Sequence, residues 1–293
     1  RNREILPKTF FLQRFSRLYP LHFVTLLVVA LLQMLFIAHD GNFFVYQFND
    51  VYNFFLHLGF ANSWSSSGVF SFNAPAWSVS IEVLLYLIFF PIVLRFNCSW
   101  FMCISISIAA YVLNEFSPQL FLPALSIFFY GGFTFHLTKA ISGKGMALKY
   151  PIVLLTCTLW LLVVCHFYLV DINGLIQLSD IQPIRLLYRV FFPLFSDFIL
   201  FPLTIISLAL IEIDRGDFLK RMSWMGDITY SSYMLHFPLQ LCYALAVSYG
   251  ILQGSFYLNP LSLIVFFLIL IPLSWIVFKK FERPVQRYIR TRF

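Results

Sequence analysis

Glu82 and Tyr86 are the two residues whose types and spacing point most clearly to chemistry. They lie four positions apart in an apolar run over residues 76–95, so a helix places both side chains on one face. A carboxylate inside the hydrocarbon of a membrane costs roughly 2.5–3.5 kcal/mol on insertion scales, and it therefore needs a partner or a function. A functional carboxylate would orient a basic group or bind a substrate. The structural alternative is a bond to an arginine or tyrosine of a neighbouring helix.

Arg14 and Arg17 are the next candidates, because residues three positions apart share one face of a helix. Two planar guanidinium groups at the mouth of an apolar segment suit the phosphates of a ligand that enters from the cytosol. The alternative is a positively charged anchor that contacts lipid phosphates. Phosphate is the expected partner in both interpretations.

A polar stripe runs through a third apolar segment, over residues 226–248. Tyr230, Tyr233 and His236 repeat every three residues and extend inward for about two helical turns. His236 would lie near the middle of a membrane, where an imidazole needs a partner. It is either a site residue or a hydrogen-bonded packing histidine.

Asp197 is a further acidic residue inside an apolar segment, between Pro193 and Pro202. The two prolines predict a kinked helix that lines a cavity, in which Asp197 is either functional or structural. The five cysteines form no Cys-x-x-Cys pair, and no histidine has an acid or cysteine at metal-ligand spacing. We therefore expect no metal site.

Eight apolar stretches could hold these residues in a membrane. Of the 293 residues, 60% are hydrophobic and only 11% are charged, against about 25% charged in an average soluble domain. A spanning helix needs about 20 mostly apolar residues. The stretches cover residues 18–38, 76–95, 98–114, 120–138, 150–170, 190–212, 226–248 and 258–278. The sequence predicts an all-α membrane protein, a polytopic bundle of about eight transmembrane helices.

The basic residues predict the side of the membrane on which each end lies. All of the 20 Lys and Arg except Arg185 and Arg189 fall on one side when the first span starts in the cytoplasm. Both ends of the chain are then cytoplasmic, and the formal net charge of +7 faces anionic lipid and cytosolic anions. This distribution argues against nucleic acid as a partner.

Four short motifs follow one another along the chain. Residues 14–20 read Arg-x-x-Arg-hydrophobic-Tyr-Pro, and residues 77–86 read Trp-Ser-Val-x-x-Glu-x-x-x-Tyr. Residues 226–236 read Gly-x-Ile-Thr-Tyr-Ser-x-Tyr-Met-x-His, and residues 281–284 are Phe-Glu-Arg-Pro. Together they resemble the signatures of the acyltransferase type 3 family, integral-membrane enzymes that O-acetylate or otherwise acylate surface glycans and related acceptors. Because members of that family resemble ten-span bundles, the resemblance implies a single transmembrane acyltransferase domain over residues 1–293 that lacks two N-terminal helices.

The resemblance also implies a reaction and its location. An acyl group, most often acetyl, would pass from acetyl-CoA or another acyl-CoA to a hydroxyl of a cell-surface or lipid-linked glycan. No cofactor would be bound, and the surroundings would be the lipid of a bacterial cytoplasmic (inner) membrane.

In this interpretation Arg14 and Arg17 bind the donor, while Glu82, Tyr86 and His236 act in catalysis. The substrate channel would be lined by Trp77, Ser78, Tyr230, Tyr233 and Asp197. The family's catalytic histidine, which belongs to an earlier helix, has no matching position here. Two alternatives stay open: an inactive fragment of an acyltransferase, and a polytopic transporter or channel in which the buried ionisable residues form an ion path.

Overall fold

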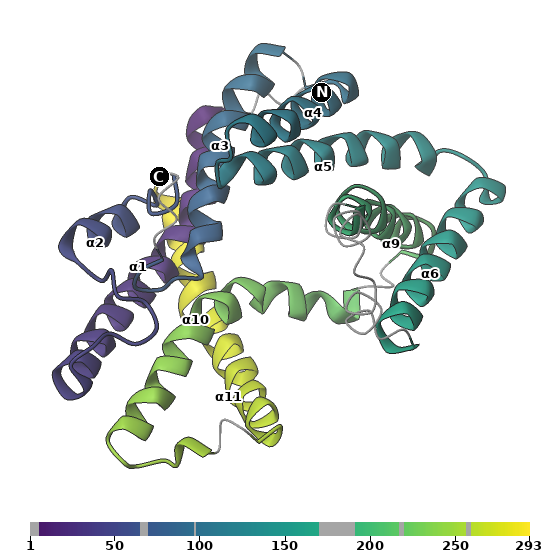
Figure 1. Ribbon diagram of the computed structural model, residues 1–293. Coiled ribbons are helices and arrows are strands. Elements are labelled where there is room, and N and C mark those ends of the chain that lie inside the picture. Colours follow the sequence, from purple (N-terminus) through teal and green to yellow (C-terminus); the bar gives the residue numbers. More distant parts are fainter. Residues whose placement is uncertain (1–5, 65–69, 97, 170–190, 217–219, 256–258) are drawn as a thin grey trace. The chain divides into compact units, whose positions relative to one another are not determined.

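The described part of the chain is mostly helical, as Figure 1 shows. A computed structural model describes residues 6–64, 70–96, 98–169, 191–216, 220–255 and 259–293. Helices account for 84% of these residues, and no strand occurs among them. Six helical segments in this part are long and apolar enough to cross a membrane. The predicted all-helical class is confirmed, and its several apolar helices are those of a multi-pass membrane protein.

Two of the eight predicted spans fall outside that set of six, each for a physical reason. The stretch 98–114 forms α4 (Trp100–Phe116), which at 17 residues is shorter than a typical span. The stretch 226–248 lies in α10 (Ser223–Ser248), which at 26 residues is long enough. It is not apolar enough, because serines, tyrosines, His236 and Gln240 interrupt its hydrophobic sequence.

The helices form two compact units. The first unit comprises Arg1–Pro91 and Met222–Phe293, and the second comprises Ile92–Arg221. The first unit contains α1 (Pro7–Asp40), α2 (Val51–Leu58), most of α3 (Ala76–Phe96), α10, α11 (Leu261–Val277), the π-helical turn η4 (Phe278–Glu282) and α12 (Arg283–Arg292). The second contains α4, α5 (Phe121–Ser142), α6 (Met146–Leu169), the π-helical turn η1 (Ser196–Leu200) and α9 (Phe201–Arg215).

Local sequence explains where α1 and α2 begin and end. Pro7 occupies the first turn of α1, where its missing N–H costs nothing, and Gly41 ends the helix with a φ of 77°. The helix is longer than the predicted span 18–38 and includes both Arg14 and Arg17. Asp50 caps α2 by accepting a 2.7 Å hydrogen bond from the backbone N–H of Asn53.

In the first unit, α1 packs against α10 and α12, and α10 packs against α11. One core cluster of the first unit lies around the turns of α1 that follow Arg14. It contains Leu18, Leu21, Phe60, Ala76, Val79, Tyr230 and Met234. These residues come from α1, from the segment after α2, from α3 and from α10. Segments far apart in sequence therefore meet around the residues that carry the motifs.

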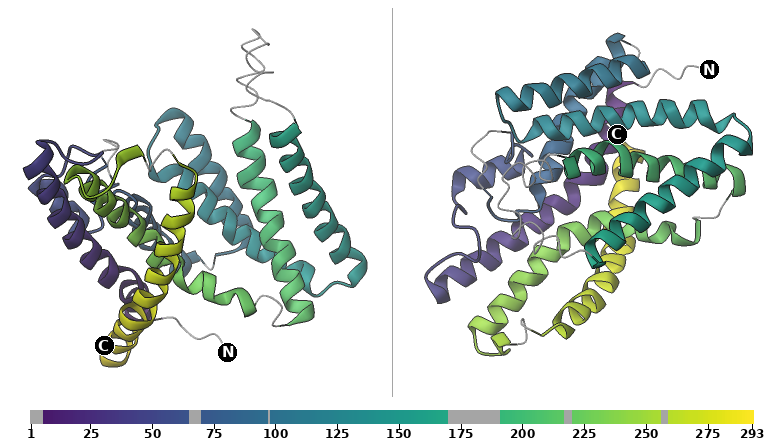
Figure 2. Two further views of the ribbon diagram at one scale, coloured as in Figure 1. Left: turned by 90° about the horizontal axis from the view of Figure 1, so that it is seen from below. Right: turned by 45° about the vertical axis from the view of Figure 1, so that its right-hand side comes forward.

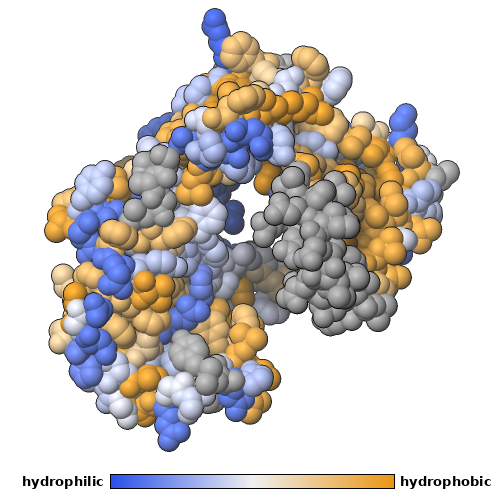
Figure 3. All heavy atoms as spheres, in the orientation of Figure 1, coloured by the Kyte–Doolittle hydropathy of each residue, from blue (hydrophilic) through white to orange (hydrophobic). Residues whose placement is uncertain are grey.

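In the second unit, α4 and α5 lie side by side in both views of Figure 2. Their close approach depends on Gly132, because a Cβ at that position would come within 2.9 Å of the Cys103 Sγ atom. α6 and α9 are joined by polar contacts, including a 2.7 Å ion pair between Lys149 and Asp214. The outer surface of α6 is strongly apolar, with Leu154, Leu161 and Leu162 exposed, and Figure 3 shows hydrophobic atoms over this region.

Candidate functional site

The Glu82–Tyr86 pair predicted from the sequence forms in the structure. Both side chains are partly buried on α3, and the Tyr86 hydroxyl donates a short hydrogen bond to the Glu82 Oε1 atom. The four-residue spacing on one helix is sufficient to bring them together. Glu82 therefore has a hydrogen-bond donor of its own helix as a partner.

Arg14 of α1 completes a three-residue contact with this pair. Its guanidinium carbon lies 4.7 Å from the centroid of the Tyr86 ring and 5.4 Å from that of Phe10. A guanidinium over an aromatic face is attracted by the ring quadrupole and leaves its N–H groups available at the edges. The first and second motifs thus meet in space.

A small cavity of about 170 Å³ adjoins this contact. Its lining residues come from α1, α3 and the segment after α2, and they are Phe11, Arg14, Phe15, Leu18, Phe60, Val83, Tyr86 and Leu87. Most of the lining is apolar, with Arg14 and Tyr86 as its polar members. We refer to this cavity as the arginine pocket.

Arg17 lies about one turn further along α1, and its side chain is exposed. Its charge acts electrostatically on Tyr86, Tyr230 and Glu282. Neither Arg14 nor Arg17 forms an ion pair with another residue of the described part of the chain. Both guanidinium groups are therefore available to an external anion.

The predicted channel residues of α10 bind backbone oxygens. The Tyr230 hydroxyl donates to the carbonyl oxygen of Leu18 at 2.5 Å. The Tyr233 hydroxyl donates to the carbonyl oxygen of Pro75 at 2.6 Å and lies 2.7 Å from the Ser78 Oγ atom. These bonds fasten α10 to α1 and to the start of α3. Ser78 and Tyr233 are brought together, and their role in a channel stays a prediction.

Trp77 and His236 make fewer contacts. The Trp77 ring is partly exposed and meets the Phe70 ring edge-on at 6.5 Å. The His236 Nδ1 atom lies 2.6 Å from the carbonyl oxygen of Tyr233. Since a carbonyl can only accept, the His236 Nδ1 atom carries a hydrogen in this contact. No hydrogen bond between described residues joins His236 to Glu82, so the two predicted catalytic residues are not directly linked.

Asp197 belongs to the second unit. It lies in η1, so the two flanking prolines accompany a wide π-helical turn at this place. The carboxylate is partly buried and accepts a 3.2 Å hydrogen bond from the Ser196 hydroxyl. Its role in a substrate channel also stays a prediction.

Glu282, which belongs to the fourth motif, is a buried carboxylate. Its side chain is 4% exposed, although it lies beside basic residues. The Ser231 hydroxyl donates to its Oε2 atom at 2.6 Å, and the Gln286 amide donates to its Oε1 atom at 3.1 Å. The third and fourth motifs therefore meet through Ser231 and Glu282. The position of Glu282 at the end of an apolar run was the sequence signal that could have predicted a buried carboxylate.

Two histidines that the sequence did not single out as site residues are almost fully buried. His22 of α1 is 0% exposed and His57 of α2 is 1% exposed, and their rings are nearly parallel with centroids 6.2 Å apart. The His22 Nε2 atom lies 2.8 Å from the carbonyl oxygen of His57 and must be the donor. The His22 Nδ1 atom is buried and has no hydrogen-bond partner among the described residues. The only sequence signal was the position of His22 two turns beyond Arg14.

His57 is held by a hydrogen bond as well. Its Nε2 atom lies 3.1 Å from the Ser71 hydroxyl, in the segment that leads to α3. Burial lowers the pKa of His57 to about 3, and the neighbouring His22 contributes to this decrease, while the hydrogen bond to Ser71 opposes it. The imidazole of His57 is therefore neutral near pH 7.

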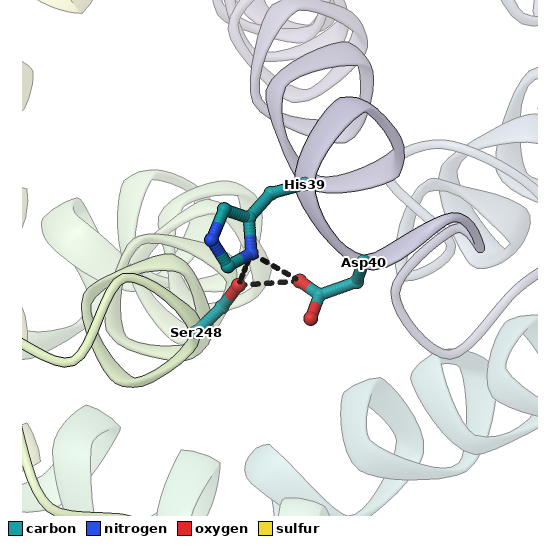
Figure 4. A network of polar contacts seen from close by, with 3 residues as sticks. All are labelled: His39, Asp40 and Ser248. Atoms are coloured by element: carbon teal, nitrogen blue, oxygen red, sulfur yellow. Dashed lines mark hydrogen bonds and ion pairs between the residues drawn. The ribbon is translucent and has the colours of Figure 1, made fainter.

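A second polar cluster lies at the opposite end of α1, and Figure 4 shows its three residues. The Ser248 hydroxyl lies 2.7 Å from the His39 Nδ1 atom and donates a 2.5 Å hydrogen bond to the Asp40 Oδ2 atom. The Asp40 carboxylate is 3.7 Å from the same His39 nitrogen. A Ser-His-Asp triad needs its serine and its carboxylate on opposite ring nitrogens. The cluster therefore joins the ends of α1 and α10 and is not a nucleophilic triad.

Comparison of the chain with protein-family models, with curated proteins and with solved structures finds no match. Within the described part of the chain, no group of three or more His, Cys, Asp or Glu side chains could hold a metal ion.

Proposed function

We propose that this chain is a membrane-bound acyltransferase of the type 3 kind, which moves an acyl group, most often acetyl, from a cytosolic acyl-CoA to a glycan hydroxyl. The observation that carries the proposal is the contact of Arg14 with Tyr86, which in turn bonds Glu82. Three motif residues from two helices converge there, and Arg17 lies about one turn further along α1. The proposal includes eight transmembrane spans with both ends cytoplasmic, in a bacterial inner membrane.

The roles follow from the chemistry of each group. Acyl transfer needs cationic groups for the CoA phosphates, donors for the developing oxyanion and a base near the acceptor hydroxyl. Arg14, which lines the arginine pocket, and the exposed Arg17 form no ion pair within the described part of the chain and serve the first role. The Tyr86 hydroxyl, which donates its one proton to Glu82 in this structure, serves the second role when it turns away from Glu82 and donates to the thioester oxygen. These contacts assign no residue to the third role, that of the base.

The test is acetyl-CoA binding by the full protein in lipid nanodiscs. Each charge-assisted bond contributes about 1.5–3 kcal/mol, so Arg14→Ala and Arg17→Ala should each raise the Kd roughly 10- to 100-fold. Arg95→Ala is the matched control, since Arg95 is an exposed arginine at the end of α3. Unchanged affinity in both α1 variants would refute the donor site.

Incorporation of radiolabelled acetyl groups into envelope glycan, with and without the gene, then tests transfer itself. A transporter or channel, for which Glu82 and Asp197 provide ionisable groups in apolar segments, predicts ion or solute flux into proteoliposomes instead. An inactive fragment predicts neither transfer nor flux.

A further inference from the structure

We propose that Arg290 of α12 binds the 3′-phosphate of the acyl-CoA donor, beside the diphosphate that Arg14 and Arg17 would bind. The inference rests on the proposed function and deepens it, because it names the residue that distinguishes CoA from donors that lack this phosphate. It is carried by the two hydrogen bonds that join Arg290 to α1, by the charge of its guanidinium group, and by the order of the three arginines around α1.

The C-terminal helix brings Arg290 to the turn of α1 that carries the first motif. α12 packs against α1, and Figure 2 shows its yellow ribbon beside the purple start of α1. The Arg290 Nε atom donates a 3.0 Å hydrogen bond to the Ser16 Oγ atom, and its Nη2 atom donates to the carbonyl oxygen of Gln13 at 3.2 Å. Ser16 is 0% exposed, whereas Arg290 is exposed. The guanidinium group is therefore fixed against α1 while its side chain stays accessible.

The contacts of Arg290 leave its positive charge uncompensated. A serine hydroxyl and a backbone carbonyl are uncharged, and Arg290 forms no ion pair with a carboxylate of the described part of the chain. The two hydrogen bonds use one hydrogen of Nε and one of Nη2, so the second Nη2 hydrogen and both Nη1 hydrogens remain as donors. Parallel N–H donors of a guanidinium group match the oxygens of a phosphate. Arg290 can therefore bind a phosphate without leaving α1.

The three arginines form an arc around one turn of α1. Successive residues of an α-helix are turned by about 100° and rise by about 1.5 Å. Viewed along the axis from Arg14, Arg17 lies about 60° to one side, and Gln13 and Ser16 lie about 100° and 160° to the same side. Because Arg290 bonds Gln13 and Ser16, its guanidinium group follows that of Arg17 in this direction. Residues 13–17 span only about 6 Å of the helix axis, so the arc is compact.

The arginine pocket lies on the other side of Arg14. Its remaining lining residues on α1 are turned about 40–100° from Arg14 in the opposite direction, and they are Phe11, Phe15 and Leu18. The order around α1 is therefore the apolar pocket, Arg14, Arg17 and Arg290. An acyl-CoA has a matching order: the acyl and pantetheine chain, the diphosphate, and the ribose that carries the 3′-phosphate. A donor whose chain points toward the pocket would place its diphosphate at Arg14 and Arg17 and its 3′-phosphate at Arg290.

The other arginines of α12 are placed differently. Arg283, Arg287 and Arg292 are exposed, and none of them forms a hydrogen bond to α1 within the described part of the chain. The Arg292 guanidinium carbon lies 5.2 Å from the ring centroid of Tyr288 on the same helix. Basic residues beside a membrane span are suited to the phosphates of anionic lipid. Arg290 differs from them because its hydrogen bonds hold it on the turn of α1 assigned to the donor.

The test compares the binding of acetyl-CoA and acetyl-dephospho-CoA, which differ only in the 3′-phosphate, by the full protein in nanodiscs of zwitterionic lipid. The wild type should bind acetyl-CoA roughly 10- to 100-fold more tightly. Arg290→Gln, whose amide can still donate to α1, should abolish this preference by weakening acetyl-CoA alone. Arg14→Ala should instead weaken both ligands alike, because both contain the diphosphate. Arg292→Gln is the matched control on α12 and should keep the preference of the wild type.

Equal affinity of the wild type for the two ligands overturns the inference, and this measurement needs no variant to fold. The inference is also overturned if Arg290→Gln keeps the preference, or if it weakens both ligands alike, as a residue that only fastens α12 to α1 would. If Arg290→Gln changes only the retention of phosphatidylglycerol added to the nanodiscs, the partner is a lipid phosphate and the inference falls. Absence of binding of either ligand by the wild type would refute the proposed function and this inference with it. Binding that Arg14→Ala weakens, without a preference for the 3′-phosphate, would refute the inference alone.

Discussion

Gln33 offers the sharpest test of how the segment that carries α2 is held on α1. Its side chain is 1% exposed and binds both backbone groups of Phe44: the amide donates to the carbonyl oxygen at 3.1 Å, and Oε1 accepts from the N–H at 2.9 Å. Gln33→Leu keeps the volume of the side chain but leaves both backbone groups without a partner. An unsatisfied buried group costs about 1–3 kcal/mol, and the partial exposure of Phe44 places the sum for the two at about 2–4 kcal/mol.

The chain provides a matched control for this substitution. Gln47 also donates its amide to a backbone carbonyl, that of Phe43 at 2.8 Å, but this contact is exposed. Gln47→Leu should therefore change the free energy of unfolding by no more than about 0.5 kcal/mol. Thermal unfolding in one detergent would compare the two variants, with an expected decrease in Tm of roughly 5–10 °C for Gln33→Leu. Equal decreases in Tm for both variants would refute the prediction that burial of the backbone groups, and not the loss of a hydrogen bond alone, determines the loss of stability.

Three further predictions concern stability. The pKa of His57 is lower in the folded than in the unfolded chain, so the unfolded chain binds the extra proton. The contribution of His57 to stability is therefore complete above about pH 6.5 and falls toward pH 3 by up to ~1.4 kcal/mol per pH unit. His57→Gln should flatten this part of a plot of the free energy of unfolding against pH, and an unchanged slope would contradict the assignment. Lys149→Met should destabilise the second unit by about 1–3 kcal/mol, since it removes the charged partner of the Asp214 carboxylate, and adding Asp214→Leu should recover most of the loss in the same unfolding assay. Gly132→Ala should lower the free energy of unfolding by about 1–3 kcal/mol, because the new methyl group would clash with the Cys103 sulfur. Adding Cys103→Ala should remove this clash and recover the stability, whereas purely additive effects of the two substitutions on the free energy of unfolding would argue against the clash.

The sequence predicted the features that depend on neighbours along the chain. Long apolar runs are sufficient to predict helices, and a four-residue spacing is sufficient to bring Glu82 and Tyr86 together. The contact of Tyr86 with Arg14 joins residues far apart in sequence and depends on which faces of α1 and α3 pack together. Helices that are apolar on nearly all faces carry little information about that choice, because the hydrophobic pattern does not mark a buried side.

The buried histidine pair illustrates the same limit. His22 lies on α1, and His57 lies on α2, a short helix between the first two predicted spans. Their contact exists only because α2 folds back onto α1, and that arrangement is fixed by hydrogen bonds such as those of Gln33 and Ser80. The Ser231–Glu282 contact could likewise not be predicted from the sequence, because its partners lie on different helices.

The polar character of α10 has a consequence for biogenesis. The Tyr230 hydroxyl bonds the carbonyl oxygen of Leu18, which is translated long before it. The Ser231 hydroxyl bonds Glu282, which is translated after it. Because α10 is not among the described helices that are apolar enough by composition to span a membrane, we expect it to partition poorly into lipid on its own as it leaves the ribosome. We then expect it to stay beside the insertion machinery until residue 282 has been translated. Nascent chains truncated before Glu282 should therefore leave α10 poorly integrated, as glycosylation mapping of stalled translation products would reveal.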